Sequence, residues 1–157
     1  MKRMWSRNEL KNSIEQTKKN VSTLVDKDGN NRFQDFDVEM ETISGITFTY
    51  SKASLSGSHL LIVIAGVLEA GTAITAVKWG ELPLPKWIRD KITPTYSAYV
   101  GSFNGQIITS GSYAVNPIAV NVDKTDTGLR IDAGSNISAD VNNKYFRIPV
   151  DLLIDFE

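Results

Sequence analysis

The spacing of apolar residues changes once along this chain of 157 residues, and that change constrains the fold more than any other feature. Segment 6–25 is polar, contains neither Pro nor Gly, and repeats its apolar residues every three or four positions. After segment 26–31 the chain is rich in Thr, Val, Ile, Ser and Gly, and its apolar residues often alternate with polar ones. The first spacing predicts a helix and the second predicts strands. We therefore expect an N-terminal helix and turn over 1–30, followed by a β domain over 31–157.

The expected helix has a start signal and a narrow apolar stripe. Ser6 followed by Glu9 is typical of a capping box. The apolar stripe falls on alternating a and d positions of a heptad repeat and consists of Leu10, Ile14, Thr17, Val21 and Leu24. A helix with so thin a stripe is marginally stable alone, so it needs a partner. That partner is either its own β domain or the same helix of identical subunits in a short coiled coil. The g positions (Ser6, Ser13 and Asn20) are uncharged, so interhelical ion pairs cannot fix the choice.

The segment after the helix resembles a calcium-binding loop only in part. With Gly29 in the glycine position of an EF-hand loop, the first ligand position is Leu24 and the twelfth is Asp35. Leu24 has no oxygen to offer, and Asp35 is short for a bidentate ligand. A turn fits better, because Asp and Asn bond their own backbone and Gly supplies a positive φ.

The β domain shows several strand patterns. The clearest has six apolar residues on one face, namely Phe146, Ile148, Val150, Leu152, Ile154 and Phe156. Near residue 38, apolar residues alternate with four acids, which we interpret as a solvated face: Asp35, Asp37, Glu39 and Glu41. The run 60–67 is continuously apolar, which predicts a strand buried on both faces. Further strands are expected near 46–50, 72–79, 95–101, 106–110, 112–122, 128–132 and 136–141, with turns at 104–105, 110–111, 127–128 and 133–136.

This many short strands predicts a mainly β chain whose head is a two-sheet β-sandwich, of jelly-roll type. One segment departs from the strand pattern. In segment 82–92, Pro85 suits the first helical position, and Trp87, Ile88 and Ile92 then share one face. We expect a short helix there that covers one end of the sandwich and stops before Pro94.

The residues that most enzymes and metal sites require are scarce. The chain has no Cys, and His59 is its single histidine, which excludes disulfides, cysteine-ligated zinc and multi-histidine sites. Nucleophile-elbow, P-loop and dinucleotide motifs are absent from the sequence. Ser58 beside His59 is no triad, since neighbours on a strand point to opposite faces. We expect no catalytic residue, no metal and no cofactor, although two distant carboxylates could still meet for glycoside hydrolysis.

Charge and hydropathy limit the partners. The chain has 17 basic and 18 acidic residues, a balance that excludes a strongly basic nucleic-acid binder. The longest apolar run, 59–68, is about half as long as a membrane-spanning helix. We expect no membrane insertion and synthesis in a cytoplasm.

Four segments resemble structural proteins of tailed phages and prophages. The opening segment 4–11 reads MWSRNELK, and the others are TYSKASLSGSHL at 49–60, LPKWI at 84–88 and FRIPVDLLID at 146–155. The opening segment resembles the start of many small structural proteins of tailed phages and prophages, and the other three are similar to segments of fibre-head or tail-fibre domains. The resemblance implies a helical stalk that leads into a β-sandwich head, commonly trimeric, attached to a virion. It also implies that the head contacts the host envelope, often a glycan, and that other virion proteins bind the N-terminus.

Two other interpretations stay open: a monomeric carbohydrate-binding module whose helix packs on its own sheet, and a hydrolase on a sandwich scaffold. Glycan contact would use exposed aromatic side chains, because sugar rings stack on apolar faces that carry a polar edge. The candidates are Trp79, Tyr96, Tyr99, Tyr113 and Tyr145, and the alternative for each is a place in the core or at a subunit interface.

Overall fold

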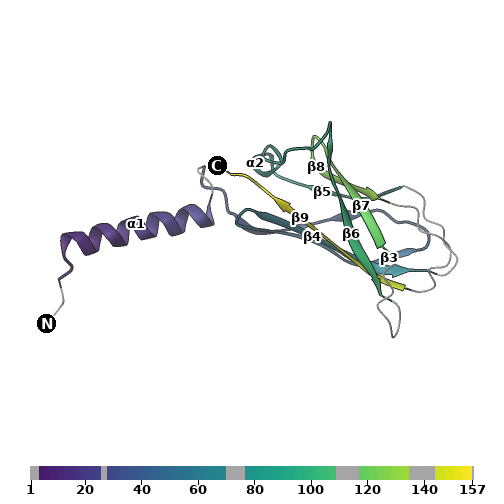
Figure 1. Ribbon diagram of the computed structural model, residues 1–157, viewed down its shortest axis with the longest axis horizontal. Helices are drawn as coiled ribbons and strands as arrows, with labels where there is room; N and C mark the ends of the chain where they lie inside the picture. The colour runs from purple at the N-terminus through teal and green to yellow at the C-terminus, as the bar shows by residue number, and fades with distance from the viewer. Residues whose placement is uncertain (1–3, 26–27, 70–76, 109–116, 135–143, 157) are drawn as a thin grey trace.

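The computed structural model describes residues 4–25, 28–69, 77–108, 117–134 and 144–156, without the side chains of 21–23, 108, 117 and 144. A long helix lies apart from a β head, as Figure 1 shows. The elements are α1 (Arg7–Leu24), β1 (Phe33–Asp37), β2 (Glu39–Met40), β3 (Ile46–Ser56), β4 (His59–Leu68), β5 (Lys78–Pro83), α2 (Lys86–Arg89), β6 (Tyr99–Ile108), β7 (Pro117–Lys124), β8 (Gly128–Ala133) and β9 (Lys144–Leu153). The expected order of an N-terminal helix, a β-sandwich head and one short further helix is confirmed.

The helix α1 begins as its sequence predicts. The Ser6 amide donates to Glu9 Oε2 at 2.7 Å, and the Glu9 amide donates to Ser6 Oγ at 3.2 Å. These two bonds form the predicted capping box and satisfy two amides that a helix start leaves without partners. The Glu9 carboxylate in the first turn also complements the positive end of the helix dipole.

The head is one antiparallel sheet that curves round until its ends nearly meet. Its strand order is β1-β3-β4-β9-β6-β7-β8-β5-β2. The two outermost strands, β1 and β2, are neighbours in sequence, separated by the single residue Val38. β1 pairs with β3 and β2 pairs with β5, so one bent segment joins the two layers. This arrangement gives a sandwich that is almost a closed barrel and leaves few free strand edges.

The core lies between the two layers and follows the alternation predicted for the last strand. The six apolar residues that alternate from Phe146 to Phe156 are all buried. They meet buried side chains of β4, β5, β7 and β8, among which Leu60, Ile62, Ile64, Trp79, Leu82, Ile118, Val120, Leu129 and Ile131 are almost fully enclosed. The predicted solvated acidic face is also confirmed, because Asp35, Asp37, Glu39 and Glu41 are all exposed.

One strand prediction is wrong. The run 60–67 was expected to be buried on both faces, but β4 alternates between buried residues and residues that are exposed or partly exposed. Leu60, Ile62 and Ile64 face the core, whereas Leu61 on the opposite face is 40% exposed. No layer of this chain covers that outer face among the residues that the structure describes, so its apolar side chains meet solvent.

A second correction concerns Asn104 and Gly105, which were expected to form a turn. They lie inside β6, a single strand that replaces the two expected at 95–101 and 106–110. A Cβ on Gly105 would lie 2.4 Å from the carbonyl oxygen of Arg147 on β9. The glycine is therefore required by close strand packing. The turn at 127–128 is confirmed by the bond from the Thr125 amide to the Gly128 carbonyl at 2.9 Å.

Several expected segments fall wholly or partly outside the described residues: 72–76 of one strand, 112–116 of another, the strand at 136–141, and the turns at 110–111 and 135–136. The short helix α2 does form after Pro85, with Ile88 and Ile92 buried. Trp87 packs against Phe156 at 5.4 Å between ring centroids. α2 therefore covers the end of the head near the C-terminus, as predicted (Figure 1).

Candidate interaction surfaces

The apolar stripe of α1 is exposed. Leu10, Ile14 and Leu24 are 51%, 55% and 52% exposed. A shallow groove along this face is lined by Arg7, Leu10, Lys11, Ile14, Glu15 and Lys18. The groove thus combines two apolar side chains of the stripe with charged side chains that lie beside the stripe, as on the surface of an amphipathic helix.

Two members of the stripe contribute differently. Thr17 donates its hydroxyl to the Ser13 carbonyl at 2.9 Å, so its polar group is satisfied within the helix and its methyl group remains for packing. The side chain of Val21 lies outside the described residues. The structure therefore places Leu10, Ile14, Thr17 and Leu24 on an exposed helix away from the head.

A short neck joins α1 to the head. The Arg32 amide donates to the Leu24 carbonyl at 2.8 Å, and Val25 forms an isolated bridge with Asn31. Gly29 lies between them with a φ of 83°, as expected of a turn glycine. Asp26, which the calcium interpretation would use, lies outside the described residues.

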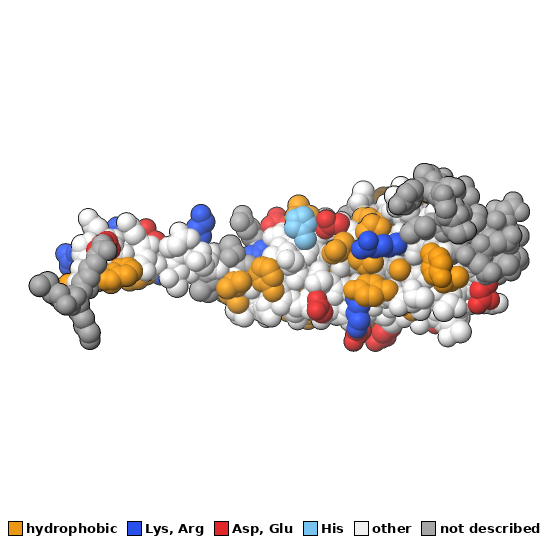
Figure 2. Space-filling model, turned by 90° about the horizontal axis from the view of Figure 1, so that it is seen from below, with side chains coloured by type: hydrophobic (Ala, Val, Ile, Leu, Met, Phe, Trp, Pro, Cys, Tyr) orange, Lys and Arg blue, Asp and Glu red, His pale blue; other side chains and the backbone are white. Residues whose placement is uncertain are grey.

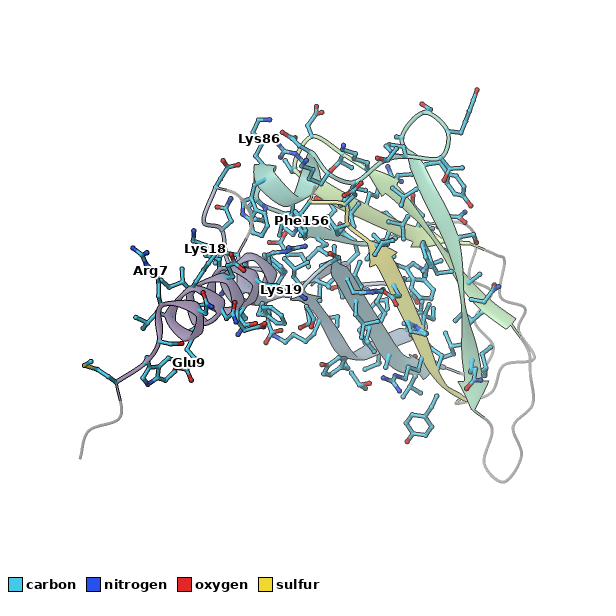
Figure 3. All side chains as sticks on the ribbon, turned by 60° about the vertical axis from the view of Figure 1, so that its left-hand side comes forward. Arg7, Glu9, Lys18, Lys19, Lys86 and Phe156 are labelled. Carbon is cyan, nitrogen blue, oxygen red and sulfur yellow. The ribbon has the colours of Figure 1, made fainter. Side chains whose placement is uncertain are left out.

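The side chain of Arg32 anchors this neck to the base of the head. Its guanidinium lies 4.7 Å from the ring centre of Phe156 and donates from Nη2 to Ser58 Oγ at 2.8 Å. Figure 3 shows Phe156 at the base of the head, beside α2. The cation over an aromatic face and the hydrogen bond to Ser58 thus hold Arg32 on the head.

The five candidate aromatic residues do not form one platform. Trp79 is fully buried between Phe48 and Phe146, at 5.5 and 5.6 Å between centroids, so the expectation that it contacts ligand is wrong. Its indole Nε1 has no hydrogen-bond partner among the described residues. Trp79 was a poor candidate because it lies on the core side of β5, a position that its sequence neighbourhood did not reveal.

The remaining aromatic candidates are scattered. Tyr113 lies outside the described residues. Tyr96 is 80% exposed beside the start of β6, where Tyr99 is partly buried, and Tyr145 is 63% exposed on β9 opposite the end of β6. A strand of this length separates its two ends by about 30 Å. Tyr96 and Tyr145 therefore cannot stack on the same sugar unit.

Several acidic side chains on the head form ion pairs. Lys52 contacts Asp37, and Lys78 binds Glu41 and Glu81 at 2.9 and 2.8 Å. The hydrogen bond to Asp37 raises the pKa of Lys52, and the bonds to Glu81 and Glu41 raise the pKa of Lys78. In the part of the chain that the structure describes, no three His, Cys, Asp or Glu side chains are grouped so that they could hold a metal ion.

His59 and Ser58 have different partners. His59 Nδ1 lies 3.0 Å from Asp151 Oδ1 on the exposed side of the sheet. Ser58 accepts its hydrogen bond from Arg32 at the neck. The two residues thus belong to separate contacts, as expected of neighbours at a strand end.

No helix within the described ranges has the length and apolarity needed to cross a membrane. Searches of family models, curated proteins and solved structures found no match to this chain.

Proposed function

We propose that this chain is a non-enzymatic structural protein of a phage virion: a trimeric fibre whose β head contacts the host surface. In this proposal α1 is the stalk that joins three identical chains, and the N-terminus binds other virion proteins. The basis is twofold: the resemblance of four segments to phage structural proteins, three of them to fibre-head or tail-fibre domains, and a helix whose apolar side chains are exposed.

The exposed stripe of α1 is the observation that carries the proposal. Burying a Leu or Ile side chain stabilises an assembly by roughly 1.5–3 kcal/mol. A trimer would bury the α1 stripes of three chains in one shared core, which would offset the marginal stability of each helix alone. The monomeric carbohydrate-binding alternative predicts a helix packed on its own sheet, whereas Leu10 and Ile14 are each more than half exposed.

Host contact would depend on avidity. Three heads on one stalk bind a multivalent surface far more tightly than one head, so each contact can be weak. The exposed ring of Tyr145 on β9 lies at the end of the strand farther from the C-terminus, where it could stack on a sugar. We propose a host surface glycan as the ligand class.

Mass measurement by light scattering tests the stalk. The full chain is expected at about three times its 17.4 kDa. The double variant Leu10→Asp plus Ile14→Asp should reduce that mass to one chain, because two carboxylates would enter the shared core. The control is Asn8→Asp plus Asn12→Asp, which adds the same charge with the same spacing on the opposite helix face and should leave the trimer intact.

A single-chain mass for the unmodified protein would refute the trimeric stalk. Equal masses for the stripe variant and the unmodified protein would show that α1 is not the contact. A glycan array with the unmodified protein then tests the ligand class: binding that Tyr145→Ala abolishes supports it. If no glycan on the array binds, the proposed ligand class is refuted, whereas the proposed trimer is not affected.

A further inference from the structure

The outer face of β4 is apolar beyond His59, and the outer face of its neighbour β9 carries apolar residues between the charged residues Arg147 and Asp151. β4 turns Leu61, Val63, Ala65 and Val67 outward, and β9 places Pro149 and Leu153 in the adjoining row. We call four of these residues, Leu61, Val63, Pro149 and Leu153, the β4–β9 stripe. Leu61 is 40% exposed and Leu153 is 73% exposed, so the stripe meets solvent in the single chain.

The strands on both sides of the stripe have polar outer faces. β3 contributes Lys52, Ser54 and Ser56 beside β4, and β6 contributes Gln106 beside β9, with Asn104 and Ser102 further along the same face of β6. An antiparallel sheet with one solvated face normally alternates apolar and polar residues. The neighbouring strands follow that rule and β4 does not, so the departure is local. A bounded apolar patch of this kind marks an interaction surface.

The stripe starts at the neck. Leu153 pairs with His59 at the first residue of β4, and the Ile154 amide donates to the Ser58 carbonyl at 2.7 Å. The Ser58 hydroxyl in turn accepts a hydrogen bond from the Arg32 side chain. The Arg32 amide donates to the carbonyl of Leu24, the last residue of α1. The stripe and the stalk helix therefore follow one another along the length of the molecule.

The two apolar surfaces also face the same way. Figure 2 shows the side of the head that carries the single histidine, and hydrophobic side chains of α1 are visible from that same side. Parallel helices that associate through one stripe place their symmetry axis along that stripe. When this axis is extended past the neck, it runs alongside the surface of the head that faces the same direction as the α1 stripe.

We infer that the β4–β9 stripe packs against further copies of this chain, around the axis on which the α1 helices associate. This inference rests on the proposed trimer, and it names the surface through which the heads of the three chains contact one another. Closed symmetry requires every copy to present the same patch to the axis. The polar outer residues of β3 and β6 then form the polar rim of an interface. The His59–Asp151 pair lies inside the stripe, because His59 pairs with Leu153 and Asp151 pairs with Leu61.

Spin labels test this placement, because the chain contains no Cys and one substitution introduces one label site. Leu153→Cys places the label on the stripe, and Ser102→Cys places a matched label on the outer face of β6. Dipolar spectroscopy of the full-length protein should give a much shorter distance between subunits for Leu153→Cys than for Ser102→Cys. Equal distances, or a longer one for Leu153→Cys, in a particle of three-chain mass would overturn the inference and assign the stripe to another partner.

The outcomes separate this inference from the proposed trimer. A single-chain mass with no dipolar coupling at either label would mean that the trimer itself fails. A second pair of variants guards against a label that disturbs packing. Leu61→Lys plus Leu153→Lys should raise the concentration at which the trimer dissociates by about tenfold or more, since a buried Lys must lose its hydration. Ser102→Lys plus Gln106→Lys adds the same charge and should not; equal effects would contradict the inference.

Discussion

The two helices of this chain are stabilised in opposite ways. α1 has 18 residues and a complete capping box, yet every described side chain from Leu10 to Asn20 is exposed. α2 has four residues and no side-chain cap, yet Ile88 is completely buried and Trp87 packs on Phe156. Local signals define the first helix, and tertiary packing defines the second.

This difference explains why only one of the helices leaves its apolar face exposed in the single chain. A single helical turn cannot persist in water, so α2 exists because the head supplies its contacts. α1 receives no comparable contacts from the head among the described residues, and its stripe remains available. An element with strong local signals and an exposed apolar face fits the proposed role of α1 as a stalk.

The largest expected effect comes from the same substitution made in each helix. Ile88→Ala should destabilise the head by about 2–5 kcal/mol, because it leaves a cavity under α2. Ile14→Ala should leave the unfolding of the head unchanged and weaken only the association of α1. Urea unfolding followed by tryptophan fluorescence measures the stability of the head in both variants. Equal losses in head stability would mean that α1 packs on the head after all.

A second prediction concerns the close contact between β6 and β9. Gly105→Ala should cost about 1–3 kcal/mol, because the new methyl group would overlap the Arg147 carbonyl and the side chain of Ile148. Gly101→Ala on the same strand is the control, since its Cβ would meet only the ring of Phe103 at 3.2 Å. Thermal unfolding should separate the two variants, and a Gly105→Ala protein as stable as the control would contradict this account of β6.

Gly105 also illustrates what the sequence could and could not predict. Alternation identified the core face of β9, and Ser6 with Glu9 identified the start of α1, because both signals act over a few residues. Asn-Gly is equally a local turn signal, but here the requirement for Gly comes from β9, about 40 residues away along the chain. Pairing between distant strands is not encoded in any short window.

The same limit applies to the candidate surfaces. The spacing of Leu10 and Ile14 predicted a helix stripe, and the structure places it in solvent. The β4–β9 stripe was missed because a continuously apolar run reads as a strand covered on both sides. Trp79 illustrates a related limit: whether a strand residue faces the core or the surface depends on register, which the sequence around it leaves open.

A smaller effect is expected at the start of α1. Ser6→Ala removes the acceptor of the Glu9 amide and should cost the helix about 1 kcal/mol. Ser13→Ala, in the middle of the same helix, should keep or raise helicity, because Ala is the better helix former. Far-ultraviolet circular dichroism compares the helix content of the two variants. The protein concentration is kept low enough for the proposed trimer to dissociate, so that α1 is not associated. Equal helicity in both variants would mean that the capping box does not set the stability of α1.

The smallest effect is expected at the end of α2, where packing already holds the helix. The hydrogen bond from Lys86 keeps the pKa of Asp90 below its ordinary value. A carboxylate with a lowered pKa in the folded state stabilises the fold above its unfolded pKa, and this contribution disappears as pH falls below about 4. Asp90→Asn should therefore be slightly less stable than the unmodified protein at neutral pH and equally stable in acid. Since both side chains are exposed, solvent screens the pair, and a stability loss at Asp90 as large as that of Ile88→Ala would show that α2 depends on its charges and not on its buried face.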